Sequence, residues 1–154
     1  MISFNEGDLS VRVLNRMGAV LLTAWCVTAC GPAVSPEQWR AGQRLFAGDT
    51  PLVARMVGHH DVLPDMATRC SNCHQTQAKV AVPGFAPTLS ASSLLTDTAR
   101  RGGPASHFDA KALCQVLRNG IDPAGVMVNQ SMPRYEVTDA QCQSMWVFLV
   151  ERAP

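Results

Sequence analysis

Residues 69–77 read RCSNCHQTQ, which places two thiols and one imidazole within five positions: Cys70, Cys73 and His74. The C-x-x-C-H spacing is typical of c-type haem attachment. The two thiols add across the vinyl groups of the porphyrin, and the two intervening residues let both sulfurs reach one edge. The imidazole that follows Cys73 then serves as the proximal iron ligand. We therefore expect one covalently bound haem c at this motif.

Two other chemistries use a C-x-x-C pair. A thioredoxin-type redox pair follows a strand within a βαβ unit, and this sequence contains no such pattern. A structural zinc site needs four ligands, commonly from two such pairs. The second pair would have to be Cys114 and Cys142, which lie on separate predicted helices. The sequence therefore favours haem over zinc and over thiol redox chemistry.

A second iron ligand is expected far along the chain, on the other face of the porphyrin. Met132 lies in the polar stretch NQSMPRYEVTD, and Pro133 stiffens the loop that presents it. Met127 is the nearest substitute. Histidines would give a bis-histidine iron instead: His59, His60 and His107. We expect Met132 as the ligand and the first two histidines on the surface. We assign three further methionines to the hydrophobic core: Met56, Met66 and Met145.

Three helices are predicted to position these residues. In the first, residues 35–49, Ser35 and Gln38 form a capping box. Its apolar stripe contains Gly42, which indicates that another backbone approaches closely there. The second helix runs from Asp109 to a stop at Gly120, and the third covers residues 138–149 with a capping box of its own.

Long segments with no helical or strand periodicity separate the helices, at residues 47–69 and 75–104. Such segments bury little apolar surface by themselves. They indicate a chain that wraps around a group serving as part of its core. We expect an all-α fold, with a few short helices and long loops wrapped around one haem.

The first thirty residues differ from the rest. Arg12 and Arg16 precede an apolar run, residues 17–30, that is too short to span a bilayer and is typical of a secretory signal. Its end, VTAC, resembles the lipobox of bacterial lipoproteins, in which the cysteine (Cys30) is acylated. A plain signal peptide is the alternative. The expected organisation is a signal peptide at 1–29, a tether at 30–34 and one domain at 35–154, exported to the periplasmic side and anchored in the membrane through lipidated Cys30.

The cysteine count is consistent with export. Cys26 leaves with the signal peptide and Cys30 carries lipid, so Cys114 and Cys142 are the pair outside the haem motif. An oxidising compartment permits a disulfide between two such cysteines. The net charge of +1 and the scattered arginines argue against a nucleic-acid partner.

The order of these features resembles a class I c-type cytochrome: a capped helix with Gly42 and Phe46, then CSNCH, a Gly/Pro loop, MPRY and a final apolar helix. The resemblance covers residues 35–154. It implies that the first and last helices cross, with Gly42 and Phe46 against Met145, Phe148 and Leu149. It also implies that the carbonyl of Pro87, in GFAPTL, accepts a hydrogen bond from the proximal histidine.

Some features depart from the plainest members of that family. The helices that carry Cys114 and Cys142 would be close, which favours a disulfide over two buried thiols. The link between the first helix and the motif is longer than usual. Arg101, with its neighbour Arg100, would neutralise haem propionates or mark a docking face, and a solvated loop is the alternative. Tyr135 would bond a propionate.

The function implied by the resemblance is single-electron transfer without substrate turnover, between a redox protein donor and a redox protein acceptor that dock transiently. Two alternatives stay open. One is a haem sensor whose sixth iron position binds small ligands, and the other is a fixed cytochrome subunit of a larger oxidoreductase.

Overall fold

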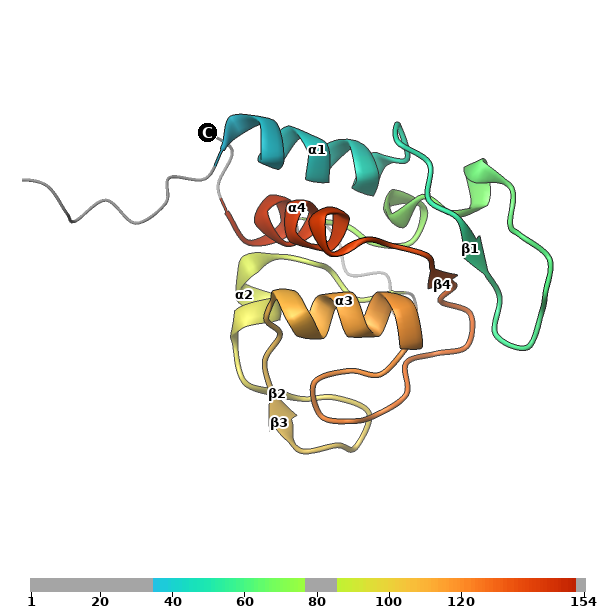
Figure 1. Cartoon of the computed structure of the whole chain (residues 1–154). Coiled ribbons are helices and arrows are strands. Elements are labelled where there is room, and N and C mark those ends of the chain that lie inside the picture. Colours follow the sequence, from blue (N-terminus) through green and yellow to red (C-terminus); the bar gives the residue numbers. More distant parts are fainter. Residues whose placement is uncertain (1–34, 77–85, 152–154) are drawn as a thin grey trace, which may run out of the picture. The chain divides into compact units, whose positions relative to one another are not determined.

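Helix α4 lies between α1 and α3 in the computed structural model, which describes residues 35–76 and 86–151 (Figure 1). The predicted signal peptide (1–29) and the tether (30–34), with Cys30, lie outside the described residues. The helices and 3₁₀ turns are α1 (Pro36–Ala47), η1 (Asp65–Ala67), η2 (Cys70–Asn72), α2 (Ala91–Leu95), α3 (Ala110–Asn119) and α4 (Asp139–Val150). Among the described residues, no helix is both long enough and apolar enough to cross a membrane.

The crossing of α1 and α4 depends on a glycine. A Cβ atom built at Gly42 would lie 2.6 Å from the carbonyl carbon of Ser144 and 2.7 Å from the Cβ of Phe148. Only a residue without a side chain allows the two helices to come so close. The ring of Phe148 then packs against Trp39 and Phe46 of α1, with centroid distances of 5.2 and 5.5 Å. The predicted close approach at Gly42 is confirmed.

All three predicted helices begin at their predicted positions, with Ser35 at the N-cap and Pro36 at the first position of α1, but of these three only α3 and α4 form the capping bonds. Thr138 and Gln141 form the predicted capping box, and α3 ends at Gly120 in the left-handed conformation. The side chain of Ser35 makes no capping hydrogen bond, so the capping box predicted there is wrong. Ser35 and Thr138 are both exposed, but their backbones differ, with ψ of 126° at Ser35 and 162° at Thr138.

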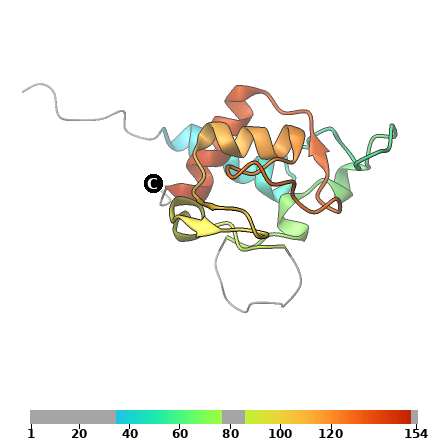
Figure 2. The ribbon, with the colours of Figure 1, turned by 90° about the horizontal axis from the view of Figure 1, so that it is seen from below.

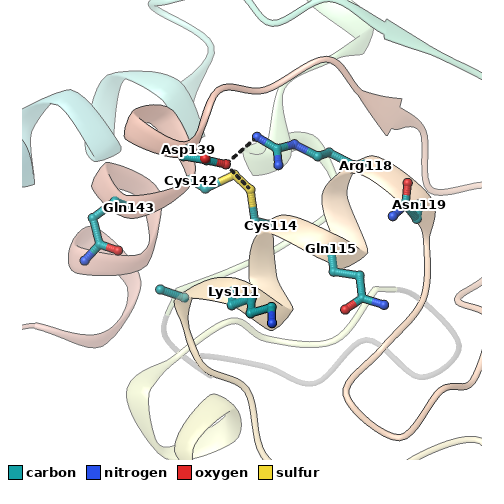
Figure 3. Close-up of a pocket in the computed structure, with 9 residues that line it drawn as sticks. Lys111, Cys114, Gln115, Arg118, Asn119, Asp139, Cys142 and Gln143 are labelled. Atoms are coloured by element: carbon teal, nitrogen blue, oxygen red, sulfur yellow. Dashed lines mark hydrogen bonds and ion pairs between the residues drawn. A yellow bond between two sulfur atoms is a disulfide. The ribbon is translucent and has the colours of Figure 1, made fainter.

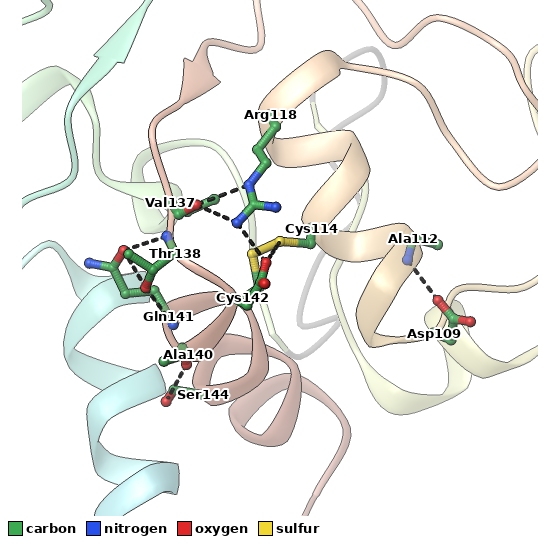
Figure 4. The surroundings of a disulfide bond; sticks show 11 residues. Asp109, Ala112, Cys114, Arg118, Val137, Thr138, Ala140, Gln141, Cys142 and Ser144 are labelled. Carbon is green, nitrogen blue, oxygen red and sulfur yellow. Dashed lines mark hydrogen bonds and ion pairs between the residues drawn. A yellow bond between two sulfur atoms is a disulfide. The ribbon is translucent and has the colours of Figure 1, made fainter.

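A disulfide joins α3 to α4 between Cys114 and Cys142, whose Cα atoms are 5.3 Å apart (Figure 4). Arg118, on the same helix as Cys114, donates from Nε and Nη2 to the carbonyl of Val137, at 2.9 and 2.6 Å. Its Nη2 also lies 2.8 Å from Oδ1 of Asp139. The start of α4 is thereby fixed to α3 by one covalent bond and one arginine. An open pocket beside the disulfide contains none of the predicted site residues (Figure 3).

The described part of the chain contains four two-residue strands, which were not part of the all-α prediction. They are β1 (Ala54–Arg55), β2 (Thr98–Ala99), β3 (Ala105–Ser106) and β4 (Arg134–Tyr135). β1 pairs antiparallel with β4, and β2 with β3. A strand of two residues is too short to show an alternating apolar pattern in the sequence, and the partner of β1 lies far along the chain. The β1–β4 pair brings the segment after Met132 next to the link between α1 and the C-x-x-C-H motif.

The segment predicted as irregular, residues 75–104, also contains a short helix, α2. Ser90 caps it, and the Ser93 side chain bonds back to the backbone of Ser90. Its Leu94 is 3% exposed and joins the main core. The residues from 77 to 85 within this segment are outside the described part of the chain.

Candidate functional site

The C-x-x-C-H motif forms a single tight turn. The carbonyl of Cys70 accepts from the backbone N–H groups of Cys73, at 3.1 Å, and of His74, at 2.8 Å. The Asn72 side chain donates to the carbonyl of Met66, at 2.8 Å, which ties the turn to the preceding segment. Cys70 is buried, Cys73 is exposed, and neither is in a disulfide. One short turn therefore carries two free thiols and an imidazole.

The His74 ring is oriented by Pro87. Nδ1 of His74 lies 2.8 Å from the Pro87 carbonyl oxygen, which is the hydrogen bond that the family resemblance implied. A carbonyl only accepts, so Nδ1 carries the proton and Nε2 keeps its lone pair in the neutral ring. Burial lowers the pKa of His74, and the bond to Pro87 partly opposes that effect. The neutral, Nδ1-protonated form is the one that binds a metal through Nε2.

The thiol environment argues against disulfide redox chemistry. Burial, the largest cause, raises the pKa of Cys70 to about 11; its backbone hydrogen bond lowers it and Cys73 raises it. Redox-active C-x-x-C thiols instead have lowered pKa values, often at the start of a helix. Here the turn that begins at Cys70 is a three-residue 3₁₀ helix.

A zinc site built from both cysteine pairs is disfavoured by the disulfide. Zinc binds thiolates, and the sulfurs of Cys114 and Cys142 are already bonded to each other. Within residues 35–76 and 86–151, no group of three or more His, Cys, Asp or Glu side chains is gathered as a metal site would require.

Tyr135 lies beside the motif. It is 7% exposed and belongs to the same buried cluster as Cys70. Burial, followed by the Cys70 and Cys73 thiols, raises the pKa of Tyr135 well above its usual value, so the phenol stays protonated. The β1–β4 pair places it there, because Tyr135 is paired with the fully buried Ala54.

Met132 is partly buried and packs against this main core. Its backbone N–H donates to the carbonyl of Asn129, at 3.0 Å, and its own carbonyl accepts from Nη1 of Arg134, at 2.6 Å. The alternative ligand Met127 is 55% exposed. Met66 is 70% exposed, which contradicts its assignment to the core, since it lies in the short 3₁₀ turn η1 at the surface.

The remaining predicted residues lie outside this cluster. His59 and His60 are exposed in the loop between β1 and the motif, as predicted. His107 is exposed and pairs with Asp97, at 2.8 Å. Arg101 is exposed, with a φ of 49°.

Arg100 has a structural set of contacts that sequence reasoning missed. Its guanidinium donates to three backbone carbonyls: Ser93, Thr98 and Ser106. It also lies 5.1 Å from the centre of the Phe108 ring. These contacts connect α2 with the β2–β3 pair. The run RRGGP signalled a loop, but no local pattern marks carbonyl partners on three separate segments.

The residues present fit a c-type haem. Both thiols are unpaired and belong to one turn, the imidazole beside them keeps Nε2 available, and its Nδ1 is hydrogen-bonded as it commonly is in metal-bound histidines. Met132 would supply a second, soft ligand from a different segment.

No protein-family model, curated protein or solved structure matches this chain. Its likeness to class I c-type cytochromes therefore stays a prediction, which rests on residues 69–77, on Pro87 and on Met132.

Proposed function

We propose that this chain is an exported monohaem c-type cytochrome that carries single electrons. Cys70 and Cys73 hold the haem through thioether bonds, and His74 and Met132 bind its iron. The observation that carries the proposal is the hydrogen bond between Nδ1 of His74 and the Pro87 carbonyl. It leaves Nε2 available on an imidazole that directly follows two unpaired thiols.

Each protein group has a defined part. The thiols each add S–H across a vinyl double bond, so attachment needs no oxidant. The Pro87 carbonyl holds the His74 ring in one tautomer and raises its basicity as a ligand. The buried neighbours of Cys70, such as Tyr135, limit the access of water.

When bound, the haem supplies one iron that gains and loses a single electron. Histidine and methionine on its two faces would leave no open position, which favours electron transfer over oxygen or peroxide chemistry. Methionine ligation would also raise the reduction potential. We therefore propose no substrate turnover by this chain.

The proposed setting is the periplasmic side of a bacterial membrane, with the domain tethered through lipidated Cys30. Redox protein partners would dock through small, transient contacts, as electron-transfer proteins usually do. Recovery of the chain as a free anchored monomer from native membranes supports a mobile carrier. Recovery in a stable complex supports a fixed subunit of an oxidoreductase.

The test is a visible and near-infrared spectrum of the full chain, exported together with a haem-attachment system, in the oxidised and reduced states. A methionine–iron charge-transfer band is expected, which Met132→Ala removes and the matched control Met127→Ala retains. Rapid carbon monoxide binding by the reduced wild type would favour the sensor alternative. Absence of haem would refute the proposal.

A further inference from the structure

The side chain of Arg134 contacts both ends of the loop that leads to Met132. This loop begins at Gly120, where α3 ends, and returns along α3 on the side away from α4 before it enters β4 (Figures 1 and 2). At its far end, Nη1 of Arg134 donates to the carbonyl of Met132, at 2.6 Å. At its near end, the guanidinium covers Gly120, where a Cβ atom would overlap Cζ, Nε and Nη2 of Arg134.

Gly120 is suited to this contact in two ways. Its φ of 69° is left-handed, which lets it cap α3 with its N–H bonded to the Val116 carbonyl. Its own carbonyl accepts from the N–H of Val128, at 2.8 Å. The absence of a side chain leaves the space that the guanidinium fills. Gly120 is therefore a fixed point against which Arg134 can hold the loop.

The backbone of Arg134 is itself fixed from another direction. Arg134 pairs with Arg55 in the β1–β4 ladder, and the N–H of Glu136 donates to the Val53 carbonyl, at 2.9 Å. The Arg55 guanidinium forms an ion pair with Glu136. The guanidinium of Arg134 therefore extends from an anchored strand, so its bond to Met132 constrains the loop.

We propose that Arg134 is a positioning residue for the sixth iron ligand. By holding the carbonyl of Met132 against the end of α3, it keeps the methionine sulfur within reach of the iron. This inference rests on the proposed function. Methionine has three rotatable side-chain bonds and little shape preference of its own, so a ligand of this kind depends on a fixed backbone.

The test is competition by imidazole for the iron of the ferric, full-length holoprotein, followed by loss of the methionine–iron band. Arg134→Met keeps an apolar stem but removes the charged donor. Hydrogen bonds from charged groups are strong enough that its loss should tighten apparent imidazole binding about tenfold.

Arg118→Met is the matched control. Arg118 also donates from its guanidinium to a backbone carbonyl, but its partners are Val137 and Asp139 at the start of α4. This variant should lower the midpoint of urea unfolding yet leave imidazole affinity within about twofold of wild type, because weakening of the α3–α4 joint does not release Met132.

The outcomes separate the inference from the proposed function. Arg134→Met binding imidazole like wild type, or Arg118→Met matching the Arg134→Met shift, would overturn the positioning role alone. A wild-type holoprotein without the methionine–iron band would overturn both. If Arg134→Met yields no folded holoprotein, Arg134→Lys replaces it. That variant keeps a positive donor but loses the planar guanidinium that covers Gly120. Imidazole should bind it more tightly than wild type but by less than about tenfold, and wild-type affinity would overturn the role of the guanidinium.

Discussion

The two regions of the domain are held together by different kinds of contact. Helices α1, α3 and α4 pack through buried apolar side chains, a close backbone crossing at Gly42 and one disulfide. The loops that carry the candidate site are fixed by single side chains bonded to backbone carbonyls: His74 to Pro87, Asn72 to Met66, and Arg134 to Met132. The helices thus share their stability over many apolar contacts, whereas the loops depend on individual hydrogen bonds to backbone carbonyls.

The largest effect is expected where the helical region has no room to adjust. Gly42→Val places a branched side chain against the backbone of Ser144. It should lower the free energy of unfolding by more than about 4 kcal/mol, because overpacking against a backbone cannot be relieved by a rotamer change. Urea unfolding followed by circular dichroism measures it. The exposed neighbour Gln43→Ala should stay within about 0.5 kcal/mol of wild type, and equal losses for the two would refute the tight crossing.

Removal of the disulfide should have the next largest effect. Cys114 and Cys142 are 28 positions apart, and closing a loop of that length is worth about 3–4 kcal/mol in the chain-entropy description. The double variant Cys114→Ala/Cys142→Ala should lose that much in unfolding free energy. Added reductant should destabilise wild type toward the same value and leave the variant unchanged. If reductant leaves the unfolding free energy of wild type unchanged, even when it is added to the unfolded chain, the disulfide is contradicted.

Within the loop region, Arg100 should matter more than its neighbour. Arg100→Met loses guanidinium bonds to three carbonyls and the contact with the Phe108 ring. We expect a loss of about 2 kcal/mol in unfolding free energy. Arg101→Met, at an exposed position, should change it by less than about 0.5 kcal/mol. A larger loss of unfolding free energy for Arg101→Met than for Arg100→Met would contradict the structural role given to Arg100.

The smallest effect compares two helix caps. Thr138 accepts from the backbone of Gln141, whereas Ser35 makes no such bond. Thr138→Ala should cost about 1 kcal/mol, and Ser35→Ala almost nothing. Urea unfolding of the two variant holoproteins measures both losses. A Ser35→Ala loss equal to that of Thr138→Ala would show that Ser35 does form the capping box predicted from sequence.

The same division explains what the sequence could predict. Helices α1, α3 and α4 follow from apolar periodicity and local caps, and the close approach at Gly42 follows from a glycine on an apolar face. The His74–Pro87 bond was reached through a family resemblance. The β1–β4 pair and the contacts of Arg134 with Gly120 join segments far apart in the chain, and two-residue strands and lone arginines carry no periodic signal. The local pattern places Ser35 correctly at the N-cap of α1, but it does not show that the Ser35 side chain makes no capping bond.

The central claim, covalent haem at Cys70 and Cys73, is tested most directly by the intact mass of the denatured protein. When the full chain is exported together with a haem-attachment system, its measured mass should exceed the summed mass of the mature polypeptide and any attached lipid by the mass of one haem. Cys70→Ala/Cys73→Ala should lack that increment, while Cys114→Ala/Cys142→Ala should keep it. A wild-type polypeptide without the added mass would contradict the account.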